Sequence, residues 1–235
     1  MALRDNLVSW WELNETSGTR VDAHGSYDLT DNNTVGSVTG IQGNGADFNN
    51  ASTEYLSSAT TFGTAIGSSV TTFSISFWFN ADIVNDNDGV INIGNFAGSQ
   101  GEFNVHLGAG SQMQTVFNGG VRSSGFTHAD LVNWHHYAMS YNGTDFTVWL
   151  DNVKKITAEA YTDTLNFTGL KMILGGYYDS RFMYNGQLDE VGVWNKALSD
   201  AEVTELYNSG SGLSYADTAG GGGSPADYSM AWANF

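Results

Sequence analysis

Residues 133–153, with the sequence NWHHYAMSYNGTDFTVWLDNV, decide the fold class. Large side chains alternate with small ones over residues 137–141, which is the period-2 pattern of a strand with one buried face. Asn142-Gly143 follows and favours a type I′ hairpin turn, because both residues tolerate positive φ angles. Residues 146–150 supply the next apolar face, and Asp151-Asn152 is a second turn candidate. The stretch therefore predicts three consecutive antiparallel strands.

The same alternation recurs along the chain, without the intervening helices that a parallel α/β fold requires. Gly, Asn and Ser clusters separate the apolar runs and indicate turns. Trp78 and Trp149 fall on the parity opposite the main apolar face, which favours a second buried layer over a contact surface. An all-β antiparallel two-sheet sandwich is expected. Its further strands are expected at Leu7–Leu13, Phe73–Phe79, Val90–Ile93, Glu102–Leu107, Met113–Phe117, Leu170–Leu174 and Gly186–Trp194.

One short C-terminal helix is predicted after Leu198. Ser199 is a good N-cap, and Glu202 stands three residues later, where it completes a capping box. Leu198 can pack on Val203 as a hydrophobic staple. Gly210 is expected to end the helix as the C′ residue.

Charge and composition exclude several classes of function. The 235 residues carry a formal net charge of −17, which disfavours contact with nucleic acid phosphates. The chain has no cysteine, so that neither a disulfide framework nor a thiolate metal site is expected. It shows no apolar run long enough to span a membrane and no signal peptide.

Five segments occur in the order found in laminin-G-like domains. They are LVSWWELNETSGTRVDAHGSYDLT (7–30), GNGADFNNASTEYLSS (43–58), FSISFWFNA (73–81), WHHYAMSYNGTDFTVWLDNV (134–153) and GQLDEVGVWNKALSDAEVTELY (186–207). Over roughly residues 5–210 the chain thus resembles that family, which is related to the pentraxins and belongs to the concanavalin A-like lectin/glucanase superfamily. The resemblance implies a jelly-roll sandwich. Asn152 stands where the family usually has Gly, and Asn also tolerates the left-handed conformation that this turn needs.

Beyond this domain, expected over residues 1–212, the composition changes. Residues 213–235 form a Gly-rich linker followed by an aromatic tail. Tyr228, Trp232 and Phe235 favour a peptide that docks on another subunit of a larger assembly, and folding back on the domain is the alternative.

The resemblance implies a Ca²⁺ site. Similar domains often hold calcium between the loop after the first strand and a late strand, positions that Asp22 and Asp189 occupy here. Ca²⁺ needs six to eight oxygen ligands, so that main-chain carbonyls would complete the shell. The alternative is that Asp22 makes an Asx-turn and Asp189 is a solvated strand residue.

Catalysis finds little support in the sequence. Glucanases of the superfamily carry a Glu-x-Asp-x-x-Glu strand that pairs two carboxylates, and that spacing does not occur. His135 and His136 are adjacent on one strand, so that their rings face opposite sides and cannot act together. We therefore expect no catalytic residues and no enzyme.

Binding is better supported, at the loop GGYYDSRFMYNG over residues 175–186. Tyr177, Tyr178 and Tyr184 stand beside Asp179 and Arg181, and aromatic rings beside polar groups are typical of sugar platforms and of protein hot spots. The alternative is that Tyr177 and Phe182 cap the core while the charged side chains are solvated.

Two functions of different class follow. The first is a glycan- or surface-binding adhesion module displayed on a larger assembly. The second is a structural decoration protein of a phage virion, on its capsid or tail, anchored through the C-terminal tail. Three features favour the second function: a single unattached domain with its own start Met, the missing signal peptide and the tail. The expected location is outside the cell or on a virion surface. A glycan-degrading enzyme is the third and least supported reading.

Overall fold

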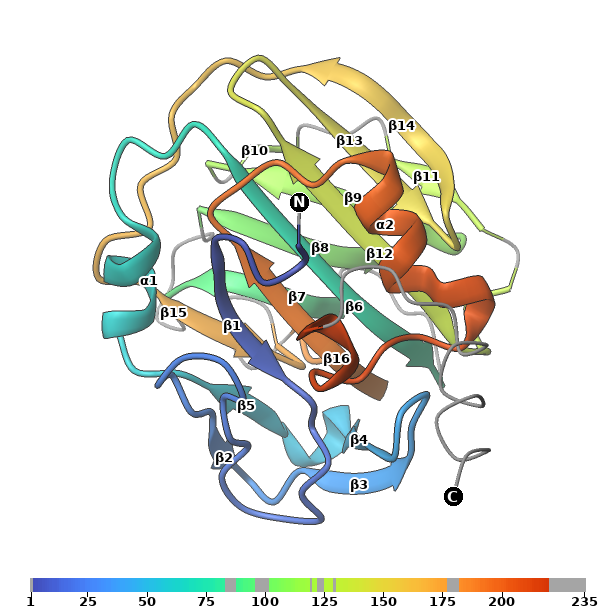
Figure 1. Cartoon of the computed structure of the whole chain (residues 1–235). Helices are drawn as coiled ribbons and strands as arrows, with labels where there is room; N and C mark the ends of the chain where they lie inside the picture. The colour runs from blue at the N-terminus through green and yellow to red at the C-terminus, as the bar shows by residue number, and fades with distance from the viewer. Residues whose placement is uncertain are drawn as a thin grey trace, which may run out of the picture.

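The computed structural model describes residues 2–82, 88–95, 102–118, 120–121, 125–128, 130–176 and 182–219, and shows two stacked antiparallel sheets (Figure 1). In spatial order the first sheet contains β14 (Val153–Ala160), β13 (Asp145–Leu150), β12 (His135–Tyr141), β6 (Phe73–Ala81), β16 (Gly186–Trp194), β4 (Asn44–Phe48) and β3 (Gly36–Thr39), and β1 (Leu7–Trp11) also pairs with β16.

The second sheet faces the first. Its order is β10 (Gly120–Val121), β9 (Gln112–Phe117), β8 (Phe103–Gly108), β7 (Asp88–Gly94), β15 (Lys171–Leu174), β5 (Tyr55–Ser57) and β2 (Thr30–Asn32), and β11 (Phe126–Thr127) pairs with β9. The helices are α1 (Thr61–Ile66) and α2 (Asp200–Tyr207), with single 3₁₀ turns η1 (Asn50–Ser52), η2 (Asn208–Gly210) and η3 (Asp217–Ala219). The arrangement agrees with a jelly-roll sandwich and confirms the expected fold class.

The core between the sheets is built from the alternating residues of β6, β12 and their neighbours. Phe77 pairs with Tyr137 across the two strands, and their rings stack at a centroid separation of 4.8 Å. Both are fully buried, as are Ile75 and Met139 beside them. Each such side chain contributes about 1.5–3 kcal/mol through burial. The predicted alternation over residues 137–141 is confirmed.

A second, smaller core lies on the outer face of the first sheet, where α2 crosses it (Figure 1). Trp149 packs there with Trp10, Trp194 and the α2 residue Leu206. Trp78 lies on the same face and stacks on Tyr207 of α2, with an angle of 14° between the rings. The expected second buried layer is therefore confirmed.

Helix α2 begins as predicted but ends earlier. Ser199 and Glu202 form the complete capping box, and Leu198 and Val203 are buried in one cluster. The C-cap is Asn208, with a left-handed φ of 46°, so that the expected end at Gly210 is wrong. Asn tolerates this conformation because its short polar side chain bonds locally, here to the Gly212 carbonyl.

The type I′ turn predicted between β12 and β13 occurs instead between β13 and β14. Asn142 has no positive φ, whereas Gly143 has one of 94°, so that this turn is not type I′. The Asn142 side chain instead accepts hydrogen bonds from the amides of Thr144 and Asp145. The type I′ pattern of two positive φ angles occurs at Asp151 and Asn152, with 51° and 62°.

Packing continues beyond Gly212, where the domain was expected to end. Leu213 and Tyr215 lie against the second core, and Thr218 is buried. Arg4 ties this segment to the N-terminus through the Thr218 hydroxyl and the Tyr215 carbonyl. None of the helices in the part of the chain that the structure describes is long and apolar enough to cross a membrane.

Candidate functional site

The expected contact loop begins and ends against β7. Gly175 donates its amide to the Val90 carbonyl, and Tyr184 donates its amide to Gly175. On the other side, the Gly89 amide bonds the Phe182 carbonyl at 3.2 Å. Four of the expected contact residues, Tyr177, Tyr178, Asp179 and Arg181, lie outside the described residues. The structure therefore fixes the two ends of the loop beside one strand.

A hydrogen-bonded polar array lies directly beside these loop ends. His106 on β8 pairs with Gly89, the same residue that bonds Phe182. Its Nδ1 lies 3.0 Å from Asn104 Oδ1 and its Nε2 lies 2.7 Å from Gln114 Oε1. Gln114 in turn donates to Gln112 Oε1 at 2.6 Å.

The array projects from the outer face of the second sheet. The residues that alternate with it on β8, namely Phe103, Val105 and Leu107, belong to the central core. His106 is buried, whereas Gln112 and Gln114 are partly exposed. No local sequence pattern brings His106 and its partners together. Its glutamine neighbours on β9 are found only once the register of the two strands is known.

Tyr184 does not offer its ring to a ligand, which corrects the expectation for this residue. It is fully buried, and its ring contacts Phe48 at a centroid distance of 6.3 Å. Its hydroxyl donates to the Asn80 carbonyl at 2.7 Å. The Tyr184 ring therefore belongs to the core and not to a contact surface.

The Asp22 carboxylate is occupied by main-chain donors. Its Oδ1 accepts from the amides of Trp10, His24 and Gly25 at 2.9–3.1 Å, and its Oδ2 accepts from the Tyr27 amide at 3.1 Å. The contact with Gly25 is so close that a Cβ there would lie 2.6 Å from Oδ2. Asp22 thus closes an Asx-turn and ties it to β1.

Asp189 has a similar environment on β16. Oδ2 accepts from the amides of Ile41 and Gln42, and Oδ1 accepts from the amide of Glu190. The residue is fully buried, so that it is not a solvated strand residue. Burial raises the pKa of Asp189 to about 7, against the lowering effect of these amides.

Glu190 follows Asp189 at a bulge in β16, with a φ of 48°. Its Oε2 accepts from the indole of Trp10 at 2.5 Å. Burial, and then the charge of Asp189, raise the pKa of Glu190 to about 10. Glu190 is therefore protonated at neutral pH.

These surroundings do not fit the Ca²⁺ that the resemblance implies at Asp22 and Asp189. Amide hydrogens point at all four carboxylate oxygens, and they present positive charge where a cation would have to sit. Ca²⁺ requires a shell made of oxygens. Among the described residues, neither aspartate belongs to a group of three His, Asp or Glu side chains close enough to share an ion.

The two adjacent histidines point to opposite sides of β12, as predicted. His136 is buried, its Nε2 bonds the Ser76 hydroxyl at 2.8 Å, and burial lowers its pKa to about 3. On the other side, His135 Nδ1 bonds Asp151 Oδ2 at 2.7 Å. Burial lowers the pKa of His135, but the hydrogen bond and charge of Asp151 outweigh it, so that the pKa is raised overall.

Sequence reasoning missed the residues that surround His135. His128 lies beside it, with ring centroids 4.7 Å apart, and Asp151 completes a compact group. A loop separates His128 from β12, and Asp151 follows the hairpin formed by β12 and β13. No local spacing in the sequence therefore indicates that the three residues meet. The only signal was the presence of Asp in a turn after a His-bearing strand.

Comparison with known proteins supports the assignment of the fold. A family model described as the concanavalin A-like lectin/glucanases superfamily, Laminin_G_3, matches residues 50–204. No curated protein sequence matches the chain.

Several solved structures are similar in fold, all at low sequence identity. Domain 4 of AbnA, a GH43 extracellular arabinanase from Geobacillus stearothermophilus, in complex with arabinotriose, has a TM-score of 0.64 at 16% identity, covering 85% of this chain and 97% of that domain. The binding domain of Paraclostridial Mosquitocidal Protein 1 has a TM-score of 0.66 at 20% identity, covering 87% of this chain and 52% of that one. Trypanosoma rangeli sialidase in complex with sialic acid has a TM-score of 0.67 at 14% identity. That match covers 89% of this chain and 34% of the sialidase, so that the chain spans only about a third of its length.

Proposed function

Because the chain belongs to the concanavalin A-like lectin/glucanases superfamily, we propose that it is a non-catalytic module that binds glycans or a glycan-bearing surface. The contact region consists of the loop over residues 175–186 and the polar array formed by Asn104, His106, Gln112 and Gln114. No catalytic residue is assigned.

The observation that carries the proposal is the position of the loop ends beside the array. Gly89 links the two, because it pairs with His106 on one side and donates to Phe182 on the other. Side-chain amides and imidazole both donate and accept hydrogen bonds, which suits the hydroxyl groups of sugars. Aromatic rings beside such groups supply the apolar surface that a sugar ring covers.

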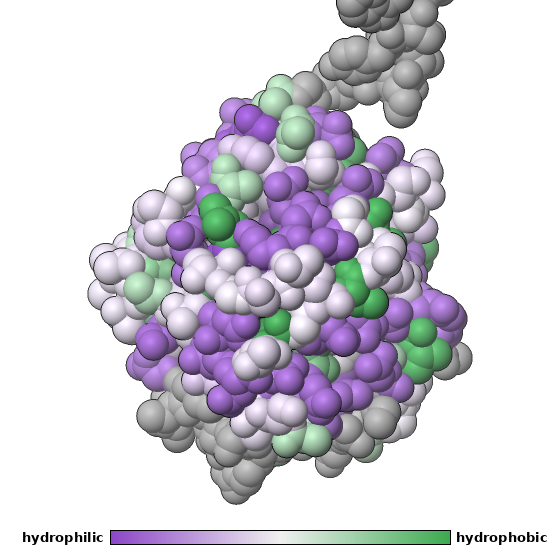
Figure 2. Space-filling view, turned by 90° about the horizontal axis from the view of Figure 1, so that it is seen from below, coloured by the Kyte–Doolittle hydropathy of each residue, from purple (hydrophilic) through white to green (hydrophobic). Residues whose placement is uncertain are grey.

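The distribution of apolar residues also favours a polar ligand. The large apolar residues exposed in the described part of the chain are Val21, Val38, Val132 and Val153, which come from separate elements. Figure 2 shows one face of the molecule as mostly hydrophilic, with apolar residues in small separate patches. This face therefore shows no large contiguous apolar patch of the kind that marks many protein interfaces.

Two of the similar structures support the class of ligand. The arabinanase domain is in complex with arabinotriose, and the binding domain of Botulinum Neurotoxin DC, with a TM-score of 0.65, is in complex with SialylT. The sialidase shows that the same fold also occurs within a glycosidase. A test of the proposal therefore has to measure both glycan binding and glycan hydrolysis.

A glycan array with the whole chain tests the proposal. Tyr178→Ala and Gln114→Ala should each lower the affinity for the bound glycan at least about tenfold, and Tyr178→Phe, which keeps the ring, should retain it. Failure to bind any glycan, or binding that neither alanine variant weakens, would contradict the proposed site. Release of reducing sugar from a bound glycan would overturn the non-catalytic part.

The tail supplies a second role, the display of this module on a larger assembly such as a phage virion. Arg4 holds Tyr215 and Thr218 against the domain, so that the segment before the tail has a fixed position. Tyr228, Trp232 and Phe235 lie outside the described residues and are the proposed docking side chains. Deletion of residues 220–235 should abolish incorporation into the assembly or lower the oligomeric mass. Unchanged incorporation and mass would exclude docking by the tail.

A further inference from the structure

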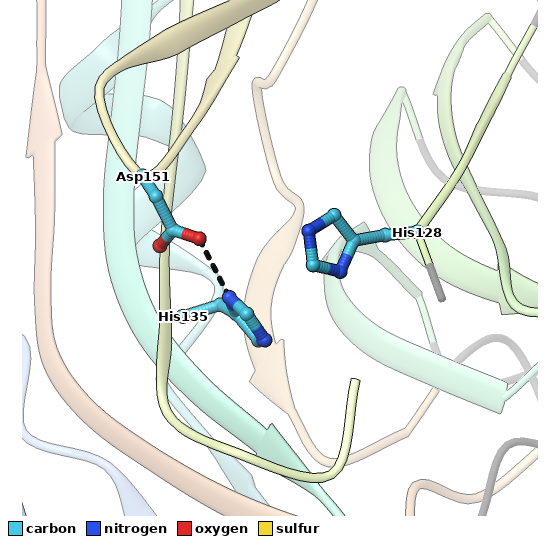
Figure 3. A group of neighbouring side chains, drawn as sticks. All are labelled: His128, His135 and Asp151. Carbon is cyan, nitrogen blue, oxygen red and sulfur yellow. Dashed lines mark hydrogen bonds and ion pairs between the residues drawn. The ribbon is translucent and has the colours of Figure 1, made fainter. Parts of the chain in front are cut away.

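Two histidines and one aspartate meet at one end of the sandwich, where His128 follows the strand residue that pairs with Gln112. His135 begins β12 and Asp151 begins the β13–β14 turn, both in the first sheet, whereas His128 follows β11 of the second sheet. Figure 3 shows the His128 ring turned with one edge toward the other two side chains. One ligand atom from each residue lies within 4.8 Å of the other two.

Hydrogen bonds define which ring nitrogens carry lone pairs. His135 Nδ1 lies 2.7 Å from the Asp151 carboxylate, and His128 Nδ1 lies 2.6 Å from the Asp130 carbonyl. Because both of these partners are acceptors, each Nδ1 carries a proton in the neutral ring. The lone pair of each neutral ring is therefore on Nε2.

The Nε2 atom of His135 is buried and has no hydrogen-bond partner within the described ranges. The His135 side chain is only 10% exposed, so that water does not readily satisfy this atom. A buried acceptor without a partner destabilises the folded state. This destabilisation is offset when the atom binds a ligand.

Asp151 is held rigidly behind His135. Its Oδ1 accepts from the His136 amide at 2.9 Å, and its own amide donates to the His136 carbonyl at 2.9 Å. Metal-binding histidines usually donate their second ring N–H to a carboxylate or a carbonyl, which orients the ring and raises its basicity. Both histidines of this group have that partner in place.

We propose that His128 and His135 bind a divalent transition-metal ion, with Zn²⁺ as the reference ion, through their Nε2 atoms. Asp151 acts as the carboxylate that orients His135. Imidazole nitrogen favours Zn²⁺, Cu²⁺ or Ni²⁺ over Ca²⁺, which takes oxygen ligands. With Zn–N bonds of about 2.0–2.1 Å in a tetrahedral site, two ligand nitrogens lie about 3.4 Å apart, so that the partly exposed His128 must rotate toward His135 for the site to close.

Such an ion would connect the two sheets. His128 and His135 come from opposite layers of the sandwich, and no disulfide joins the layers, since the chain has no cysteine. The proposed site differs in position, ligands and metal from the calcium site implied at Asp22 and Asp189.

Calorimetric titration of the metal-free full chain with ZnCl₂ tests the proposal. One Zn²⁺ per chain should bind, and Co²⁺ should give the visible absorption bands of a nitrogen-ligated site. His128→Ala should lower the Zn²⁺ affinity at least about tenfold, and Asp151→Asn, which keeps a residue suited to the turn, should lower it about 10–100-fold. His24→Ala, which removes a histidine elsewhere, should leave the affinity unchanged.

Three results would overturn the site. They are the absence of Zn²⁺ binding, equal affinity of His128→Ala and the unsubstituted chain, and loss of binding in His24→Ala. CaCl₂ should give no heat that depends on His128. Because His128 is partly exposed, its alanine variant is expected to fold, and a melting curve without metal confirms that folding.

Discussion

Lys196 Nζ lies 2.6 Å from Glu202 Oε1, and both side chains are only 9% exposed. This ion pair lies beneath the start of α2. Lys196 also donates to the Ala2 carbonyl, and Glu202 Oε2 accepts from the amide and hydroxyl of Ser199. One carboxylate thus connects the helix N-terminus, the end of β16 and the N-terminal segment.

Glu202→Ala should destabilise the fold by about 3–5 kcal/mol, because it leaves the buried Lys196 ammonium without its counter-charge. Urea unfolding measures the loss. Lys154→Ala is the matched control: its pair with Asp200 has side chains 39% and 67% exposed, and its removal should cost less than about 1 kcal/mol. Equal losses in the two variants would mean that burial of the Lys196 pair contributes nothing.

Stability at acid pH should depend on the same carboxylate. Burial raises the pKa of Glu202, but Lys196 and Ser199 outweigh it, so that the pKa falls below its ordinary value of 4.5. A lowered pKa in the folded state contributes stability above the unfolded value, and this is lost as the pH falls through the folded value. The unfolding free energy of Glu202→Gln should therefore decline less steeply below about pH 5 than that of the unsubstituted chain. Urea unfolding of both proteins at several pH values across this range tests the prediction. Identical slopes of unfolding free energy against pH would contradict the lowered pKa of Glu202.

The type I′ turn at Asp151-Asn152 makes a prediction about backbone strain. Asn152→Ala places a side chain with no local hydrogen bonding at a φ of 62° and should cost about 1–2 kcal/mol. Asn152→Gly should be less costly than Asn152→Ala, because Gly adopts this conformation freely, although it loses the contact with the Thr204 hydroxyl. Urea midpoints compare the two. Because both variants lose the contact with Thr204, a glycine variant less stable than the alanine variant would contradict the strain assigned to this position.

The turns at Asn142-Gly143 and Asp151-Asn152 show what local sequence can predict. The positions of both turns followed from the alternation around them, because strand periodicity is a local property. Their types did not, since Asn142 uses its side chain to cap the turn, whereas Asp151 is drawn into position by His136 and His135. Those contacts depend on the paired strand and are invisible to a dipeptide rule.

The same limit applies to the functional residues. The helix capping box was predicted because its two partners are three residues apart. The polar array was not, because His106 and Gln114 meet only through the register of β8 and β9. Tyr184 was expected at the surface from its polar loop, but it fills the space beside Phe48. Burial of an aromatic ring in a loop depends on long-range packing that local composition does not encode.

Asp22→Asn tests the role of the Asp22 carboxylate in the loop after β1. The amide group would turn a donor toward backbone N–H groups that now bond a carboxylate, so that a loss of at least about 2 kcal/mol is expected. Asp5→Asn, which alters one exposed contact with the Ala2 amide, should cost less than about 0.5 kcal/mol. Added Ca²⁺ should change the melting temperature of neither variant nor of the unsubstituted chain. A rise that requires Asp22 would restore the calcium site.

Truncations test where the packed domain ends. The segment after Gly212 buries Thr218 and places the Tyr215 ring 4.0 Å from the Arg4 guanidinium, so that these contacts disappear when the chain stops at Gly212. We expect that truncation to cost at least about 2 kcal/mol and lower the Tm by about 4–8 °C. A chain that ends at Ala219 keeps every one of these contacts and should melt within about 1 °C of the full chain. Calorimetric scans of the three lengths measure both effects. Equal Tm values for the two truncations would place the boundary at Gly212, whereas a lower Tm for the chain ending at Ala219 would show that residues 220–235 also stabilise the domain.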